Sequence, residues 1–201
     1  MATLNFPDIV PDSAEWTITY NTQVFESDLN GAIQTAELPG ARWSASLTFS
    51  NRQGRDAREL RAFLAQLKGR AGRFWLTPSD WEPLGTADGI PQVSVAASAG
   101  ATSVSTTGWT AEQPEALLAG DHIEINGELK IVTATVAADI NGDATIQFAP
   151  PARTDFTVGM EVETSEPRAL MALADDDQAA WNIGAPIIYA ITINCREPLD
   201  V

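Results

Sequence analysis

The sequence predicts a mainly β protein with a single α-helix, and three observations carry this prediction. Apolar and polar residues alternate with period two along much of the chain, as they do in half-buried strands. One segment changes to the longer period of an amphipathic helix. Short strand-like runs in the middle of the chain are separated by turn signals such as Asn126-Gly127. We therefore expect a β-sandwich or tube-like domain with one flanking helix, plus an inserted small β-barrel or β-sandwich.

The N-terminal part of the chain, residues 15–50, alternates as half-buried strands do. Trp16 and Ile18 point to one side, and the threonines between them point to the other. Asn30-Gly31 tolerates the positive φ angles of a tight turn, so it predicts a hairpin between 24–27 and 32–38. The stretch ARWSASLTFS then places four apolar side chains on one face, namely Trp43, Ala45, Leu47 and Phe49.

A helix is predicted over residues 56–68. Asp56, followed three residues later by Glu59, fits a capping box at its start, and Gly69 fits the left-handed position after its end. Because the apolar residues recur at i, i+3, i+4 and i+7, we expect one stripe to pack on the sheet face that carries Phe49. The stripe consists of Leu60, Phe63, Leu64 and Leu67.

The chain is predicted to form one discontinuous domain with a second domain inserted in it. From about residue 83 the sequence becomes rich in Gly, Ser, Ala and Thr and contains several short strand-like runs. The closing run PIIYAITINC has apolar side chains on one face, so it needs a sheet, and the N-terminal strands are its natural partners. That face consists of Ile187, Tyr189, Ile191, Ile193 and Cys195. We therefore predict a domain from 1–82 and 166–201, with 83–165 inserted.

The charge of the chain restricts its partners. The net charge is −15, so bulk electrostatics excludes stable binding to nucleic acid or to an anionic membrane. No run of about 18 apolar residues is present, so no membrane segment is predicted. A single cysteine excludes an internal disulfide framework and favours folding in a reducing cytoplasm.

Positive charge is concentrated in one place, because seven of the twelve basic residues lie between 52 and 73 against only two acidic ones. This segment carries +5 and the rest of the chain −20. A basic strip on an acidic body favours contacts between subunits, although a solvated helix face remains the alternative. The candidate subunit-interface residues are Arg55, Arg58, Arg61, Arg70 and Arg73.

Residues arranged for catalysis or for metal binding are sparse. His122 is the only histidine, and no nucleophile elbow accompanies it. Asp139, Asn141 and Asp143 have the spacing of a calcium loop, but the later glycine and glutamate positions of such a loop are not matched, which favours an acidic turn. We therefore expect no enzyme activity, no catalytic residues, no cofactor and no metal.

Six tryptophans are many for 201 residues, and exposed tryptophan rings can stack on sugars. Trp16 and Trp43 lie on the apolar side of alternating strands, so core packing is expected for them. Trp81 and Trp109 lie next to turns and are the candidate surface or glycan contacts.

Four stretches in a fixed order resemble a group of siphophage tail proteins of the distal-tail or tail-tip kind. They are ARWSASLTFS, RDARELRAFLAQLKGRAGRFWLTP, LLAGDHIEINGELKIVTATVAADINGDATIQFAPPAR and VGMEVETSEPRALMALADDD, and together they cover roughly residues 41–177. The resemblance implies a structural virion protein whose tube-like belt domain carries an inserted peripheral β domain.

In this family the belt domains close into a ring, commonly a hexamer, that joins the tail tube to the tail tip. The implied partners are further copies of the chain, the tail tube protein and the tip or hub proteins, and the implied location is the virion, after assembly in the host cytoplasm. The main alternative is a carbohydrate-binding module for host recognition at the tail tip. A glycosidase or peptidoglycan hydrolase is disfavoured because no catalytic set of residues is present.

Overall fold

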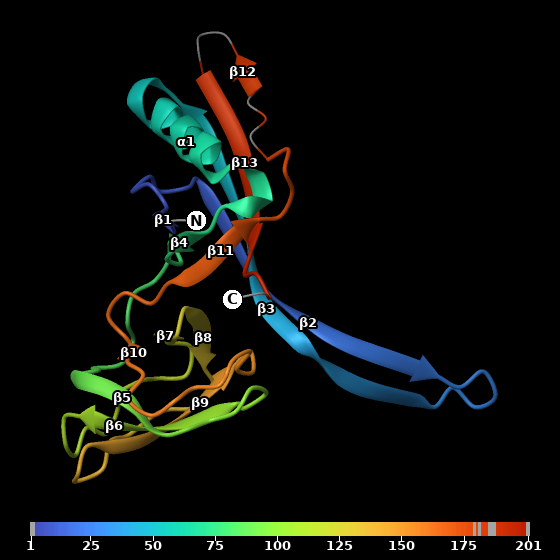
Figure 1. Ribbon diagram of the computed structural model, residues 1–201. Coiled ribbons are helices and arrows are strands. Elements are labelled where there is room, and N and C mark those ends of the chain that lie inside the picture. Colours follow the sequence, from blue (N-terminus) through green and yellow to red (C-terminus); the bar gives the residue numbers. More distant parts are fainter. Residues whose placement is uncertain (1–2, 179, 181, 185–187, 200–201) are drawn as a thin grey trace.

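The computed structural model describes residues 3–178, 180, 182–184 and 188–199. These residues form two β-sheets, one of them nearly barrel-shaped, and one α-helix (Figure 1). The predicted mainly β fold class with a single flanking helix is confirmed.

The first sheet is built from both ends of the chain, in the order β1-β4-β11-β13-β3-β2, with β12 beside β13. Its closing strand β13 pairs antiparallel with β3, so that Cys195 lies opposite Ala45 and Ile193 opposite Leu47. The closing run thus finds its partner among the N-terminal strands, as expected, although Ile187 lies outside the described residues. The strands are β1 (Leu4–Asn5), β2 (Ser13–Glu26), β3 (Ile33–Arg52), β4 (Phe74–Leu76), β11 (Ala169–Leu173), β12 (Asn182–Gly184) and β13 (Ile188–Arg196).

The helix α1 spans Gly54–Leu67 and is followed by the short 3-10 helix η1, Gly69–Ala71. The predicted capping box is wrong, because α1 begins earlier: Gln53 is the N-cap, without a side-chain cap, and Asp56 lies in the first turn. The predicted left-handed end is present, since Lys68 and Gly69 have φ angles of 54° and 69°. No helix in the described part of the chain is long and apolar enough to cross a bilayer.

The core of the first sheet forms where α1 packs on it. The predicted helix stripe Leu60, Phe63, Leu64 and Leu67 is buried in one cluster with Trp43, Leu47 and Phe49. Phe63 lies edge-on to Phe6 and Phe74, with ring centroids 5.1 and 5.4 Å apart. The expected packing of the stripe on this sheet face is therefore confirmed.

The second sheet has the order β10-β7-β8-β9-β6-β5 and is nearly closed. Its outer strand β5 meets the segment just before the other outer strand, β10, where the Val93 N–H donates to the Met160 carbonyl at 2.8 Å and the Val93 carbonyl accepts from the Gly159 N–H at 2.9 Å. Asn126 and Gly127, with φ angles of 53° and 77°, form the tight turn between β7 and β8. The strands are β5 (Gly89–Val95), β6 (Ser103–Trp109), β7 (His122–Ile125), β8 (Glu128–Val132), β9 (Asp143–Ala149) and β10 (Val162–Glu163).

The two sheets are packed against each other through β8. Leu129 of β8 is fully buried within the core of the first sheet, and Ile131 packs against the same core. The Trp43 indole Nε1 donates a 3.0 Å hydrogen bond to the Leu129 carbonyl. Every strand of the second sheet lies within residues 89–163. The finer boundaries of the two folding units, at 82 and 166, stay a prediction.

Candidate assembly interface

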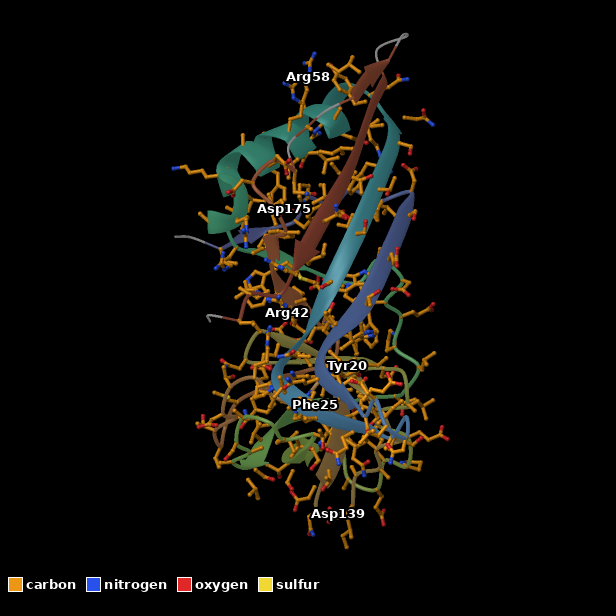
Figure 2. All side chains as sticks on the ribbon, turned by 90° about the vertical axis from the view of Figure 1, so that its right-hand side faces the viewer. Tyr20, Phe25, Arg42, Arg58, Asp139 and Asp175 are labelled. Carbon is orange, nitrogen blue, oxygen red and sulfur yellow. The ribbon has the colours of Figure 1, made fainter. Side chains whose placement is uncertain are left out.

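A long hairpin extends away from the two sheets (Figure 1). We call its outer part, residues 20–38, the arm. Beyond Tyr20 the strands β2 and β3 pair only with each other, from Asn21 opposite Leu38 to Glu26 opposite Ile33. Leu29 at the tip is 98% exposed, and Tyr20 and Phe25 are also exposed (Figure 2). The arm is therefore a two-stranded ribbon that carries large apolar side chains in water.

Among the residues that the structure describes, no strand pairs with either edge of the arm. The strand β13 pairs with β3 only between Ser44 and Arg52, so it does not reach the arm. The strand β2 is an edge of its sheet along all fourteen of its residues. A ribbon of two strands is at best marginally stable alone, and an open edge is a template for pairing with another chain. These are the physical properties of a surface that another molecule covers.

The two faces of the arm differ in charge, and the strand register shows which side chains lie on each face. One face carries two carboxylates, and we call it the acidic face: Thr22, Val24, Glu26, Ile33, Thr35 and Glu37. The opposite face is uncharged and rich in amides: Asn21, Gln23, Phe25, Gln34, Ala36 and Leu38. No basic residue lies between 20 and 38, so the arm is purely anionic.

A groove of about 550 Å³ lies between the base of the arm and the second sheet. Leu38, Pro39 and Leu199 line it together with Ala152 and Arg153. The lining is mostly apolar, and Arg153 is held by its own chain through ion pairs to Glu128 and Glu197. The groove suits an apolar side chain better than it suits acid–base chemistry.

The predicted interface arginines on α1 lie on its outer surface. Arg55, Arg58 and Arg61 are all exposed, and Figure 2 shows Arg58 on the outer side of α1. The Arg55 side chain is 91% exposed although its Nε lies 3.7 Å from the Glu59 carboxylate. An ion pair so exposed contributes little to stability, so these cations remain accessible to a partner.

The remaining two interface candidates, Arg70 and Arg73, differ from each other. Arg70 is exposed, but its backbone N–H donates to the Asp176 carboxylate at 2.9 Å. Arg73 is half-buried, and its guanidinium donates to the carbonyls of Arg70, Ala71 and Gly72. Arg73 therefore stabilises the η1 turn of its own chain, and it is a poor interface residue. The carboxylate of Asp176 also offsets part of the positive charge near this end of the basic segment.

The surface position expected for Trp109 is wrong, because its side chain is only 5% exposed within the second core. Val104 and Thr106 are the buried positions of β6, so strict alternation would place residue 109 outside. Gly108, with a φ angle of 93°, reverses this alternation and turns the indole inward. The Trp109 Nε1 then donates to the Thr106 hydroxyl at 2.8 Å.

Trp81 is half-buried and packs at the junction of the two sheets. Its Nε1 donates to the Ser165 carbonyl at 3.3 Å, and its ring meets His122 edge-on at 5.5 Å. The His122 ring also lies 5.7 Å from that of Trp43. His122 is therefore an aromatic packing residue between two tryptophans, and burial lowers its pKa against the smaller opposing effect of Asp80 and Asp121.

This lowered pKa predicts a pH dependence of stability. Because the folded state disfavours the charged imidazole, the unfolded chain binds the proton more tightly. We expect the free energy of unfolding to fall as pH drops from about 6.5, the ordinary histidine value, through the lower pKa of the folded state. The measurement is urea unfolding at pH 5.5, 6.5 and 7.5 for the wild type and for His122→Gln, which should lose this component. Equal pH slopes for both proteins would contradict it.

The acidic turn predicted at DINGD is confirmed. One Asp139 carboxylate oxygen accepts from the backbone N–H groups of Asn141 and Asp143, at 2.7 and 2.9 Å. These hydrogen bonds lower the pKa of Asp139. Within the described ranges, no group of three or more His, Cys, Asp or Glu side chains is placed to hold a metal ion.

A buried ionic cluster connects the two sheets, and the sequence pattern did not reveal it. Glu197, fully buried, accepts hydrogen bonds from the Trp43 N–H of the first sheet at 2.9 Å and from the Leu129 N–H of the second at 3.3 Å. Arg153 lies 3.3 Å from Glu197 and 3.6 Å from Glu128. One carboxylate therefore holds backbone from both sheets together with an arginine. The spacing of residues along the sequence does not predict such a contact, because the residues that form it lie far apart in the chain.

The charge states in this ionic cluster follow from burial and from the neighbouring charges. Burial raises the pKa of Glu197, and Arg153 opposes this effect. Burial also works against the charge of Glu128, but the Lys130 ammonium 2.7 Å away and hydrogen bonds from Arg153 and Thr154 outweigh it and lower the pKa of Glu128. Burial lowers the pKa of Lys130, which is itself fully buried.

Cys195 is buried on the inner face of β13, and burial raises the pKa of its thiol to about 12. A protonated and enclosed thiol is unreactive, so Cys195 is not suited to join copies of the chain covalently.

Comparison of the chain with protein-family models and with characterised proteins finds no match.

Proposed function

We propose that this chain is a self-assembling structural protein, a ring-forming component of a long non-contractile phage tail that joins the tail tube to the tail tip. Its role in this proposal is mechanical and not catalytic. Its partners are further copies of itself, commonly in a hexamer, the tail tube protein and the tip or hub proteins. It would work in the virion after assembly in the host cytoplasm.

The arm is the single observation that carries the self-assembly part of this proposal. A monomer gains nothing from a ribbon that leaves Val24, Phe25 and Leu29 in water and exposes the whole edge of β2. Apolar surface and open strand edges are stabilised when another chain covers them. The phage-tail part of the proposal is supported by the four ordered stretches between residues 41 and 177 that resemble distal-tail and tail-tip proteins.

Removal of the arm tests the proposal. Replacing residues 22–37 by Asn-Gly leaves Asn21 and Leu38 as the pair that flanks a two-residue turn. All core residues of β2 and β3 remain in place, since none lies between 22 and 37. We expect this variant to fold but to stay monomeric, whereas the wild type forms rings. Native mass spectrometry and electron microscopy of the purified proteins provide the measurement.

Far-ultraviolet circular dichroism and thermal unfolding of the shortened variant control for loss of the fold. The proposal fails if the full-length chain is a monomer at concentrations of tens of micromolar, or if the shortened variant assembles as well as the full-length chain does. We propose no second function, because Trp109 is buried and Trp81 is half-buried against His122, which leaves the glycan-binding alternative without a supporting observation.

A further inference from the structure

We propose that, in the assembly, the acidic face of the arm of one copy lies against the outer surface of α1 in the next copy. This inference rests on the proposed self-assembly and names the two surfaces that meet. The first argument is charge. The arm carries Glu26, Asp28 and Glu37 and no cation. The surface of α1 and its end is net cationic, since four exposed cations outnumber its two exposed carboxylates: Arg55, Arg58, Arg61 and Lys68 against Asp56 and Glu59.

The spacing of the charges matches as well. Glu37 lies opposite Thr22, so Glu37 and Glu26 are separated by four residues along the same face of the ribbon. That separation corresponds to about 14 Å of strand. Arg58 lies in α1 and Lys68 is its C-cap, ten residues later, which corresponds to a rise of about 15 Å along the helix axis and a rotation of about 80° around it, within the reach of long basic side chains. Two carboxylates of one copy can therefore reach two cations of the next at the same time.

The apolar parts of the two surfaces are complementary too. Val24 and Ile33, on the same face as the two carboxylates, are 58% and 63% exposed. Between Arg58 and Lys68 the helix presents Ala62 and Ala65, which are also exposed. Because alanine side chains are small, branched aliphatic side chains can approach the helix closely. Burial of this apolar area adds a favourable contribution that is independent of charge.

A single molecule does not make this contact with itself. The arm points away from α1 in Figure 1, and in Figure 2 α1 lies at the top while Tyr20 and Phe25 of the arm lie in the lower half of the view. One surface therefore meets a different surface on the neighbour. Contacts of this heterologous kind close into rings when the rotation between neighbours allows it, unlike the self-complementary contact of a two-fold dimer.

Charge reversal on each side separately tests the inference. One variant, Arg58→Glu with Lys68→Glu, has an acidic helix and an unchanged arm. The other, Glu26→Lys with Glu37→Lys, has a basic arm and an unchanged helix. Like charges then face each other at every contact, so we expect each variant alone to assemble at least about tenfold more weakly than the wild type. Sedimentation velocity over a concentration series measures this change.

Mixing the two variants gives the sharper result. The basic arm of one variant fits the acidic helix of the other, and the unchanged arm fits the unchanged helix, so alternating copies satisfy every contact. We therefore expect an equimolar mixture to assemble within about threefold of the wild-type concentration dependence. A control with Asp143→Lys and Glu161→Lys, two exposed acidic residues of the second sheet, should assemble as the wild type does.

Two results would overturn the inference while the proposed function stands, provided that the wild type forms rings. In the first, each reversal variant alone assembles as well as the wild type does. In the second, the equimolar mixture of the two variants assembles no better than either variant alone. If the control variant is the only one that assembles more weakly than the wild type, the partner surface lies on the second sheet, and this result also overturns the inference. A wild-type chain that stays monomeric would contradict the proposed function and the inference with it. Thermal unfolding like that of the wild type confirms that each variant is folded, as expected because all six altered residues are exposed.

Discussion

Replacement of Glu197 by alanine is expected to lower the free energy of unfolding by about 3–5 kcal/mol, because it breaks a buried ion pair and removes the acceptor of two buried backbone N–H groups. Arg153 would lose one of its two carboxylates, at 3.3 Å. The backbone N–H groups of Trp43 and Leu129 would lose their acceptor between the two sheets. Each buried donor left unpaired is itself costly, so no part of this contact is dispensable. Urea unfolding followed by tryptophan fluorescence measures the change.

Two control variants distinguish this effect from a general sensitivity of the protein's stability to substitution. Glu197→Gln keeps one of the two acceptor oxygens, and so an acceptor for one of the two backbone N–H groups, but it removes the charge; we therefore expect a smaller loss than for alanine. Glu15→Ala changes an exposed carboxylate on β2, and its effect should stay within about 0.5 kcal/mol. A loss below about 1 kcal/mol for Glu197→Ala would show that Glu197 does not hold the two sheets together.

Replacement of Phe63 by alanine is expected to destabilise the protein by about 3–5 kcal/mol, the range for large aromatic side chains deleted from a core. Phe63 fixes α1 on the first sheet, and its ring contacts those of Phe6 and Phe74. Without this ring a cavity remains between the helix and strand β4, and the helix that carries the cations loses its main anchor. Differential scanning calorimetry provides the measurement.

Gln66→Ala is the matched control, because Gln66 lies on the exposed side of the same helix. Its change should stay within about 0.5 kcal/mol, since alanine is also a good helix former. Equal effects of Phe63→Ala and Gln66→Ala would mean that the packing of α1 contributes little to stability, against the buried cluster described above.

Local periodicity was sufficient to predict most elements of the fold. The helix stripe Leu60, Phe63, Leu64 and Leu67 and the strand face that contains Leu47 were both recognisable, because each repeats with the period of its own backbone. The hairpin at Asn30-Gly31 and the turn at Asn126-Gly127 were recognisable from residues that accept positive φ angles. The helix cap was predicted wrongly, since Gln53 begins the helix without a side-chain hydrogen bond.

Less of the candidate sites could be predicted from sequence patterns. The concentration of arginines between 52 and 73 was visible in the composition, but only the coordinates separate the exposed Arg58 from Arg73, which binds carbonyls of its own chain. Alternation failed for Trp109, because the positive φ angle of Gly108 reverses the faces of the strand. Exposure of the arm also depends on the tertiary structure, because only the strand pairing shows that β13 stops short of residues 20–38.

The amino-acid order alone therefore settles the mainly β character, the one helix, the tight turns and the uneven charge, because each of these depends on neighbours within a few residues. The three-dimensional packing settles which surfaces are left uncovered and which charges are buried. Glu197 meets Trp43 and Leu129 across more than sixty residues of chain, and β13 ends beside β3 before the arm begins. Contacts between segments this far apart in the chain produce no periodic pattern in the sequence, because they depend on how whole sheets pack together.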